Sequence, residues 1–112
     1  MAFLHYGSDP VPIEIDDRTM AHLKLVVTTK LRRNESFTLT CTHPHESGER
    51  RTALWIQPSI PLRFEYMYAE SDPLDKDLLR ELAEAANTNA GIVIEQSTQL
   101  APPTELPMRR AA

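Results

Sequence analysis

The residue types best suited to chemistry gather in one short segment, His43-Pro44-His45-Glu46. Two imidazoles and a carboxylate are ligands that zinc and other transition metals accept. The H-x-H spacing places both rings on the same side of an extended segment, and the sequence offers no evident fourth ligand. We therefore keep His43, His45 and Glu46 as weak metal candidates, with a solvent-exposed loop as the ordinary alternative, and we expect no cofactor.

Nucleophilic or acid–base chemistry would fall to Cys41 or to the pair Asp16 and Asp17. A reactive cysteine needs a neighbouring base and an exposed, electropositive setting, whereas Cys41 alternates with Phe37 and Leu39 on an apolar face. The two aspartates stand just before a predicted helix, where a carboxylate caps backbone N–H groups. The sequence thus predicts no catalytic residues. A single cysteine cannot form an internal disulfide, so the expected location is the reducing cytoplasm.

Binding of nucleic acid would use the cations concentrated in AHLKLVVTTKLRRNESF, 21–37, and in the segments around it. The candidate phosphate contacts are Arg18, Lys24, Lys30, Arg32, Arg33, Arg50 and Arg51. Two observations count against this role: the net charge is −4 at pH 7, and the sequence contains no helix-turn-helix, RNP-type or zinc-finger pattern. Nucleic-acid binding therefore stands as the alternative function.

The arrangement of these cations depends on the structure of residues 18–33, which fit either a helix or a strand. The helical stripe consists of Met20, Leu23, Val27 and Leu31. The β-branched run from Val26 to Thr29 lowers helix propensity. We predict a helix because an acidic cap precedes the segment, cations end it, and it is longer than an ordinary strand.

Two apolar residues of this helix, Leu25 and Val26, fall outside that stripe. Their position indicates a second covered face, supplied by another element or by another copy of the chain. Trp55, on a predicted strand, could contribute to the same contact. Two-fold dimers are the commonest small assembly, so we expect a homodimer with Leu25, Val26 and Trp55 at its interface.

The remaining elements follow from alternating apolar and polar residues. Strands are predicted over residues 3–6, 11–15, 36–43, 50–56, 62–66 and 92–94. The first two would form a hairpin with Pro12 at a sheet edge, and the next three a meander with a polar loop at 44–49. A second helix is expected to begin at Pro73, with Asp72 as its N-cap.

The order ββαβββαβ predicts an α+β domain over residues 1–96: one largely antiparallel sheet of about six strands, with two helices packed on one face. The Pro-rich residues 97–112 are expected to form a flexible tail. At 112 residues with 41% hydrophobic and 25% charged content, the chain has the composition of a small soluble domain. No apolar run approaches the length that spans a membrane.

Several motifs in order suggest a family. They are Tyr6-Gly7, Asp16-Asp17-Arg18, Ala21-His22-Leu23-Lys24, Lys30-Leu31-Arg32-Arg33 with Glu35-Ser36-Phe37, and Trp55 through Pro58-Ser59-Ile60-Pro61-Leu62 to Phe64. In these residues the chain resembles a family of small actinobacterial proteins, a domain of unknown function whose members are often labelled "ATP-dependent DNA ligase". The resemblance covers residues 1 to about 96.

The ligase label implies a lysine nucleophile in a Lys-x-Asp-Gly motif. None of Lys24, Lys30 and Lys76 is followed by that motif. The resemblance therefore implies a self-contained fold without catalytic residues to carry over. The predicted function is a non-enzymatic binding or interaction module of the cytoplasm, homodimeric and with an unknown ligand. The alternative is a nucleic-acid-binding accessory protein linked to DNA repair or ligation.

Overall fold

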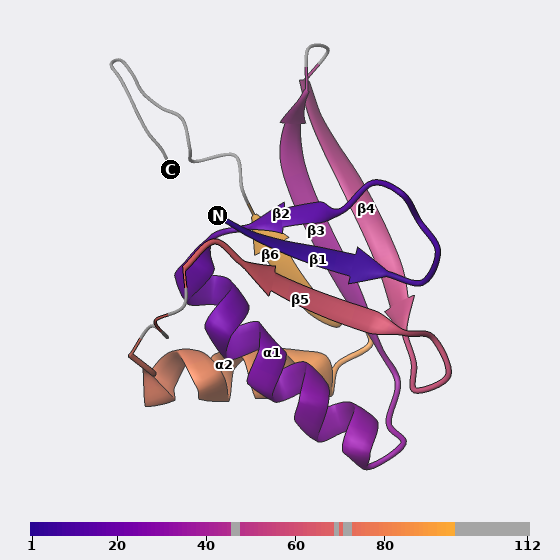
Figure 1. The fold of residues 1–112 in the computed structure, drawn as a ribbon. Helices are drawn as coiled ribbons and strands as arrows, with labels where there is room; N and C mark the ends of the chain where they lie inside the picture. The colour runs from indigo at the N-terminus through magenta and orange to yellow at the C-terminus, as the bar shows by residue number, and fades with distance from the viewer. Residues whose placement is uncertain (46–47, 69, 71–72, 96–112) are drawn as a thin grey trace.

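The computed structural model describes residues 1–45, 48–68, 70 and 73–95, and within these ranges it contains six strands and two helices (Figure 1). Sheet A has the strand order β2-β1-β5, and sheet B has the order β4-β3-β6. The strands of sheet A are β1 (Ala2–Tyr6), β2 (Ile13–Ile15) and β5 (Leu62–Tyr66). Those of sheet B are β3 (Phe37–His45), β4 (Gly48–Ile56) and β6 (Ile92–Glu95). The α+β class and the order ββαβββαβ are confirmed, but the strands form two sheets of three instead of the single sheet predicted.

The pairing of the strands differs from the predicted meander in one place. The hairpin of β1 and β2 is confirmed, with β2 at the sheet edge, and β3 pairs antiparallel with β4. However, β5 pairs with β1 rather than with β4. The connection after Ile56 contains Pro58 and Pro61, and the Pro61 carbonyl accepts a hydrogen bond of 2.8 Å from the Gly7 N–H. This bond holds the start of β5 beside the end of β1, so β5 joins sheet A.

The β3–β4 hairpin is longer than predicted. The segment 44–49 was expected to be a polar loop, but β3 continues to His45 and β4 begins at Gly48. The loop prediction was wrong at both ends, since Pro44 pairs with Glu49 and His45 with Gly48 across the ladder. The distal part of this hairpin rises past sheet A (Figure 1).

The helix α1 (Asp17–Arg32) confirms the helical interpretation of this segment. The Asp16 side chain caps its first turn by accepting a hydrogen bond of 2.9 Å from the Thr19 N–H. The helix ends before Asn34, whose φ of 61° is the left-handed conformation that stops a helix. Val26 and Val27 are tolerated despite their low helix propensity because both are buried, and packing outweighs propensity.

The helix α2 (Lys76–Ala86) begins three residues later than predicted, and its N-cap is Asp75. The Asp75 carboxylate accepts hydrogen bonds from the backbone N–H groups of Asp77 and Leu78. Asp75 is also fixed from outside the helix, because its own N–H donates to Nε2 of His22 at 2.7 Å. Asp72, the predicted cap, lies outside the described residues.

The core forms where the two helices meet the inner faces of the sheets. Both helices lie on the same side of the molecule, with α1 in contact with β5 and α2 in contact with β3 and β6 (Figure 1). The core is built from Leu4 and Ile15 of sheet A, Leu39 and Ile92 of sheet B, and Leu23 of α1. Within the described residues, neither helix is long and apolar enough to cross a membrane.

The imidazole of His22 links the two helices inside this core. It is fully buried; its Nδ1 lies 2.6 Å from the Arg18 carbonyl oxygen, and its Nε2 accepts from the Asp75 N–H. These partners fix the neutral tautomer with the proton on Nδ1, because a carbonyl can only accept and an N–H can only donate. His22 is therefore a structural residue that orients α2 against α1.

Candidate functional site

A groove of about 680 Å³ runs between the β1–β2 hairpin and the β3–β4 hairpin. Its walls are mainly apolar, and its lining includes Phe3, Tyr6, Ile13, Cys41, His43 and Leu54. The volume is within the range of roughly 300–1,000 Å³ that small-molecule sites occupy. The groove contains two of the residues that the sequence suggested for chemistry, Cys41 and His43.

Cys41 cannot act as a nucleophile in this position. Its side chain is 0% exposed, which confirms the prediction of a buried, small apolar residue. Burial raises the pKa of the Cys41 thiol to about 11, so the thiolate is scarce at neutral pH. The thiolate is the reactive form, so this cysteine serves packing.

The metal candidates lie partly inside and partly outside the described residues. His43 lies in β3, and its Nε2 is 3.4 Å from Thr52 Oγ1. The side chain of His45, and Glu46 as a whole, lie outside the described residues. Across the part of the chain that the structure describes, no group of three His, Cys, Asp or Glu side chains could hold a metal ion.

The seven predicted phosphate contacts do not share one surface. Lys30 is only 9% exposed; its Nζ donates to Asn87 Oδ1 at 2.7 Å and pairs with Glu35 at 3.1 Å. Arg18 forms an ion pair of 2.8 Å with Asp75. Lys30 is therefore held in contacts within the chain, whereas the Arg18 side chain is 56% exposed beside its acidic partner.

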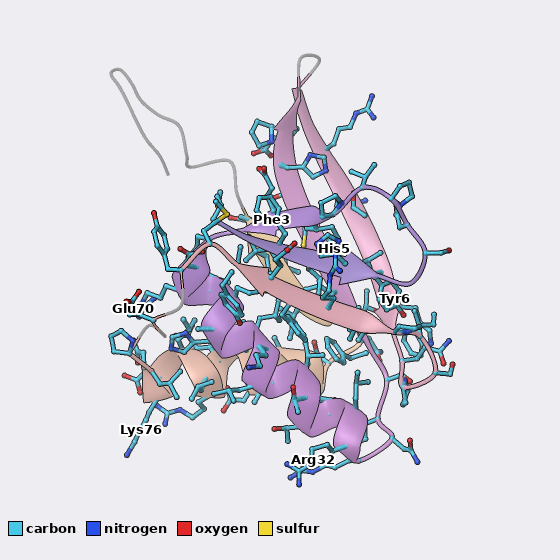
Figure 2. The ribbon with its side chains drawn as sticks, viewed as in Figure 1. Phe3, His5, Tyr6, Arg32, Glu70 and Lys76 are labelled. Atoms are coloured by element: carbon cyan, nitrogen blue, oxygen red, sulfur yellow. The ribbon has the colours of Figure 1, made fainter. Side chains whose placement is uncertain are left out.

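The other five cations are exposed but separated. Arg32 and Arg33 stand at the C-terminal end of α1, with Lys24 about two turns before them. Arg50 and Arg51 stand near the start of β4, by the tip of the hairpin. The end of α1 and the tip of the hairpin lie at opposite ends of the molecule (Figures 1 and 2).

The three predicted interface residues also occupy different environments. Val26 is 6% exposed and belongs to the same buried cluster as Leu23 and Val27. The second covered face of α1 is thus explained within the chain, and Val26 offers almost no surface to a partner. Leu25 is partly exposed on α1, whereas Trp55 of β4 is 59% exposed.

Trp55 belongs to a sheet surface that the described helices leave exposed, which we call the outer face of sheet B. The pairing register places its side chains on the face opposite Leu39 and Cys41. Its members are Thr38, Thr40, Thr42 and Pro44 of β3, Glu49, Arg51, Ala53 and Trp55 of β4, and Val93 and Glu95 of β6. Trp55 is held at its backbone, where its carbonyl accepts a hydrogen bond from the Tyr6 hydroxyl.

The outer face of sheet B is uncharged over most of its area. Among the described residues its charges are Arg51 and Glu95, which flank Thr42, and Glu49, which pairs with Pro44 at the same end. Val93 is 50% exposed on this face, and it was not among the predicted interface residues. The run Ile92-Val93-Ile94 is apolar throughout, and that was the available signal, since an edge strand with one face in water normally alternates with polar residues.

The outer face of sheet A has a different composition. The register places Phe3 and His5 of β1, Glu14 of β2, and Arg63 and Glu65 of β5 on it. His5 Nε2 lies 2.9 Å from Glu65 Oε1 and 3.5 Å from an Arg63 guanidinium nitrogen. His5 and Phe3 are labelled on this sheet in Figure 2.

Comparison with known proteins adds one family. The family model described as Domain of unknown function (DUF7882) matches residues 1–97. No curated protein and no solved structure matches the chain.

Proposed function

Since the chain belongs to the DUF7882 family of domains of unknown function, we propose its role from its surface: a non-enzymatic interaction module of the cytoplasm that forms a homodimer through the outer face of sheet B. One observation carries the proposal. Trp55 and Val93 are 59% and 50% exposed on a sheet face that no described helix or strand covers.

Leaving the apolar side chains of this face in water is unfavourable in free energy. Each Å² of apolar surface removed from water contributes about 25 cal/mol of favourable free energy. Contiguous exposed apolar surface on a folded domain commonly marks a binding site. Tryptophan is enriched among the residues that dominate binding energy, because it removes a large area from water and loses little conformational freedom. Trp55 is therefore the expected anchor of the interface.

A second copy of the chain is the best occupant for this face. The middle of the face is uncharged, and its end carries one cation, Arg51, and two anions, Glu49 and Glu95. A surface with both charges can complement an identical surface, as a two-fold interface requires. A strongly basic or acidic partner would leave the charges of its own sign on this face unpaired.

Nucleic-acid binding is supported less well. Lys30 and Arg18 are paired within the chain, and the exposed cations of α1 and β4 stand far apart. We expect no binding of DNA or RNA at about 50 mM salt, a condition that favours phosphate contacts. Binding that falls steeply with added salt would instead favour this role. A ligase activity is outside the proposal, and no covalent lysine adenylate should form with labelled ATP.

Sedimentation velocity of two matched variants tests the dimer. Val93→Asp places a charge on the outer face of sheet B, whereas Val11→Asp changes an equally apolar residue, 71% exposed, away from that face. We expect wild type and Val11→Asp to sediment as twice the chain mass of 12.7 kDa, and Val93→Asp as a single chain. A strict wild-type monomer at high micromolar concentration would refute the proposal.

A further inference from the structure

The groove between the β1–β2 and β3–β4 hairpins is open because one hairpin is longer than its cover. The inner face of sheet B is closed at one end, where Phe37, Leu39 and Ile56 are at most 3% exposed. Leu54 and Thr52, further along β4 on the same face, are only half-buried. The β3–β4 hairpin rises past sheet A here (Figure 1), so its inner face becomes one wall of the groove.

The opposite wall comes from the β1–β2 hairpin and is mainly apolar. Val11, Pro12 and Ile13 line it, and Val11 is 71% exposed. A valine this exposed leaves apolar surface in water that a ligand with an apolar body would cover. The two walls therefore suit a ligand that gains most of its binding free energy from burial of apolar atoms.

The ionised side chains of the groove have one sign. Among its described lining residues they are Asp9 and Glu14, and no described cation forms an ion pair with either. Asp9 accepts a hydrogen bond of 3.0 Å from the Val11 N–H, which leaves its negative charge in place. Met1 also lines the groove, but its amine pairs with Asp17 at 3.2 Å. The two carboxylates thus give the groove an unbalanced negative charge.

The wall formed by the β3–β4 hairpin does not balance this charge. His43 Nε2 lies 3.4 Å from Thr52 Oγ1, so these two polar groups face each other. Arg50 pairs with His43 across the ladder and shares its face, but it is exposed nearer the tip and is not among the described lining residues. One cation near the groove therefore stands against two carboxylates on its rim.

We infer that this groove binds a small amphipathic amine, a molecule with an apolar body and one ammonium group. The apolar body lies between the two walls, and the ammonium group lies beside Asp9 or Glu14. Both carboxylates are exposed, so they contribute selectivity for a cation more than affinity. The inference is independent of the proposed dimer, because neither Trp55 nor Val93 is among the described lining residues.

Three probes with the same apolar body test the inference: phenylbutylamine, phenylbutanol and phenylbutanoate. Each is titrated into the isotope-labelled full chain at about pH 8, where an ordinary imidazole is neutral and an alkylamine is charged. We expect the amine to shift the backbone amide signals of residues 9–14, 41–43 and 52–54. Its Kd should be about three- to tenfold lower than that of the alcohol, and the carboxylate should bind most weakly.

Removing the two carboxylates should remove the preference. In the double variant Asp9→Asn and Glu14→Gln the three probes should bind with equal Kd, because the apolar walls remain and the new amide can still accept from the Val11 N–H. The matched control is Glu81→Gln with Glu84→Gln. It removes the same charge from exposed positions of α2, outside the groove, and should keep the wild-type preference.

Every other outcome counts against the inference. Equal binding of the three probes by wild type, a preference for the carboxylate, no binding at millimolar concentration, or shifts centred on Trp55 would each overturn it. Shifts of the groove amides on dilution without a probe would identify a second copy as the occupant and overturn it as well. Repeating the titration in Val93→Asp separates these results from the proposed dimer, since the amine should bind that variant equally well.

Discussion

The outer faces of sheet A and sheet B meet the same solvent but are built from different side chains. On sheet A, His5 lies between Glu65 and Arg63, and the face is charged and polar around Phe3. On sheet B, threonine, alanine, valine and tryptophan fill most positions, and the charged residues Glu49, Arg51 and Glu95 lie at one end. A sheet face that stays in water usually carries polar side chains, as sheet A does. The composition of sheet B suits a face that becomes covered.

The inner faces of the two sheets show no such contrast. Leu4 of β1 and Leu39 of β3 are both buried in the same core. The difference between the sheets thus lies in their outer faces. We conclude that substitutions on the outer face of sheet B should alter association more than folding, and the following predictions test that separation.

The largest effect is expected from comparing neighbouring residues of β3. Leu39→Ala removes a fully buried side chain and should lower the free energy of unfolding by about 2–5 kcal/mol. Thr40→Ala, one residue along and on the outer face, should change it by no more than about 0.5 kcal/mol. Both variants should also carry Val93→Asp, so that dissociation does not contribute to the free energies of unfolding measured in urea. Equal losses for the two variants would show that both faces serve the fold.

Giving sheet B the character of sheet A should dissociate the proposed dimer. Thr40 stands in the middle of the face, so Thr40→Lys brings two like charges together at the interface. We expect the Kd to rise about 100-fold, which corresponds to about 3 kcal/mol. Glu65→Lys on the outer face of sheet A is the matched control and should leave the Kd unchanged. A Kd that responds equally to both would place the interface elsewhere.

The buried thiol on the inner face should make stability fall in alkali. The pKa of Cys41 is raised from 9.0 to about 11 by burial, so the folded chain keeps a proton that the unfolded chain loses between these values. Stability is therefore complete below pH 9 and declines as the pH rises towards 11, by about 2–3 kcal/mol. Urea unfolding at several pH values should show this slope, and Cys41→Ala should lack that component of it.

The smallest effect is expected at the cap of α2, away from both outer faces. Hydrogen bonds from the backbone N–H groups of Asp77 and Leu78 lower the pKa of Asp75. Its contribution to stability is present above the ordinary aspartate pKa and is lost as the pH falls through the lowered value. Helix content followed by circular dichroism in acid should decline over that range, less so in Asp75→Asn. An unchanged acid profile in the variant would mean that other carboxylates control it.

Local pattern was enough to predict some elements and not others. The helix α1 and the ladder of β3 with β4 follow from periodicity and caps that lie within each segment. The pairing of β5 with β1 could not be predicted this way, because it depends on contacts between residues far apart in the chain, such as the bond from Gly7 to Pro61. The cap of α2 was misplaced for the same reason, since His22 of α1 helps to fix Asp75.

The candidate surface was predictable only in part. Trp55 was identified from its residue type and strand position. The helical wheel placed Val26 outside the apolar stripe, but it cannot show that the chain's own core covers that position. Val93 joins the surface only because Thr40 pairs with it across the β3–β6 ladder. Such a parallel register depends on the whole fold, so no local pattern reveals it.

The most direct test of a covered outer face on sheet B uses Trp55 itself, which is the single tryptophan of the chain. Its emission spectrum and its quenching by acrylamide can be followed as the wild-type protein is diluted from high to low micromolar concentration. We predict blue-shifted, protected emission at high concentration that shifts to the red and becomes quenchable on dilution. Emission and quenching that stay those of an exposed tryptophan at every concentration would contradict the account.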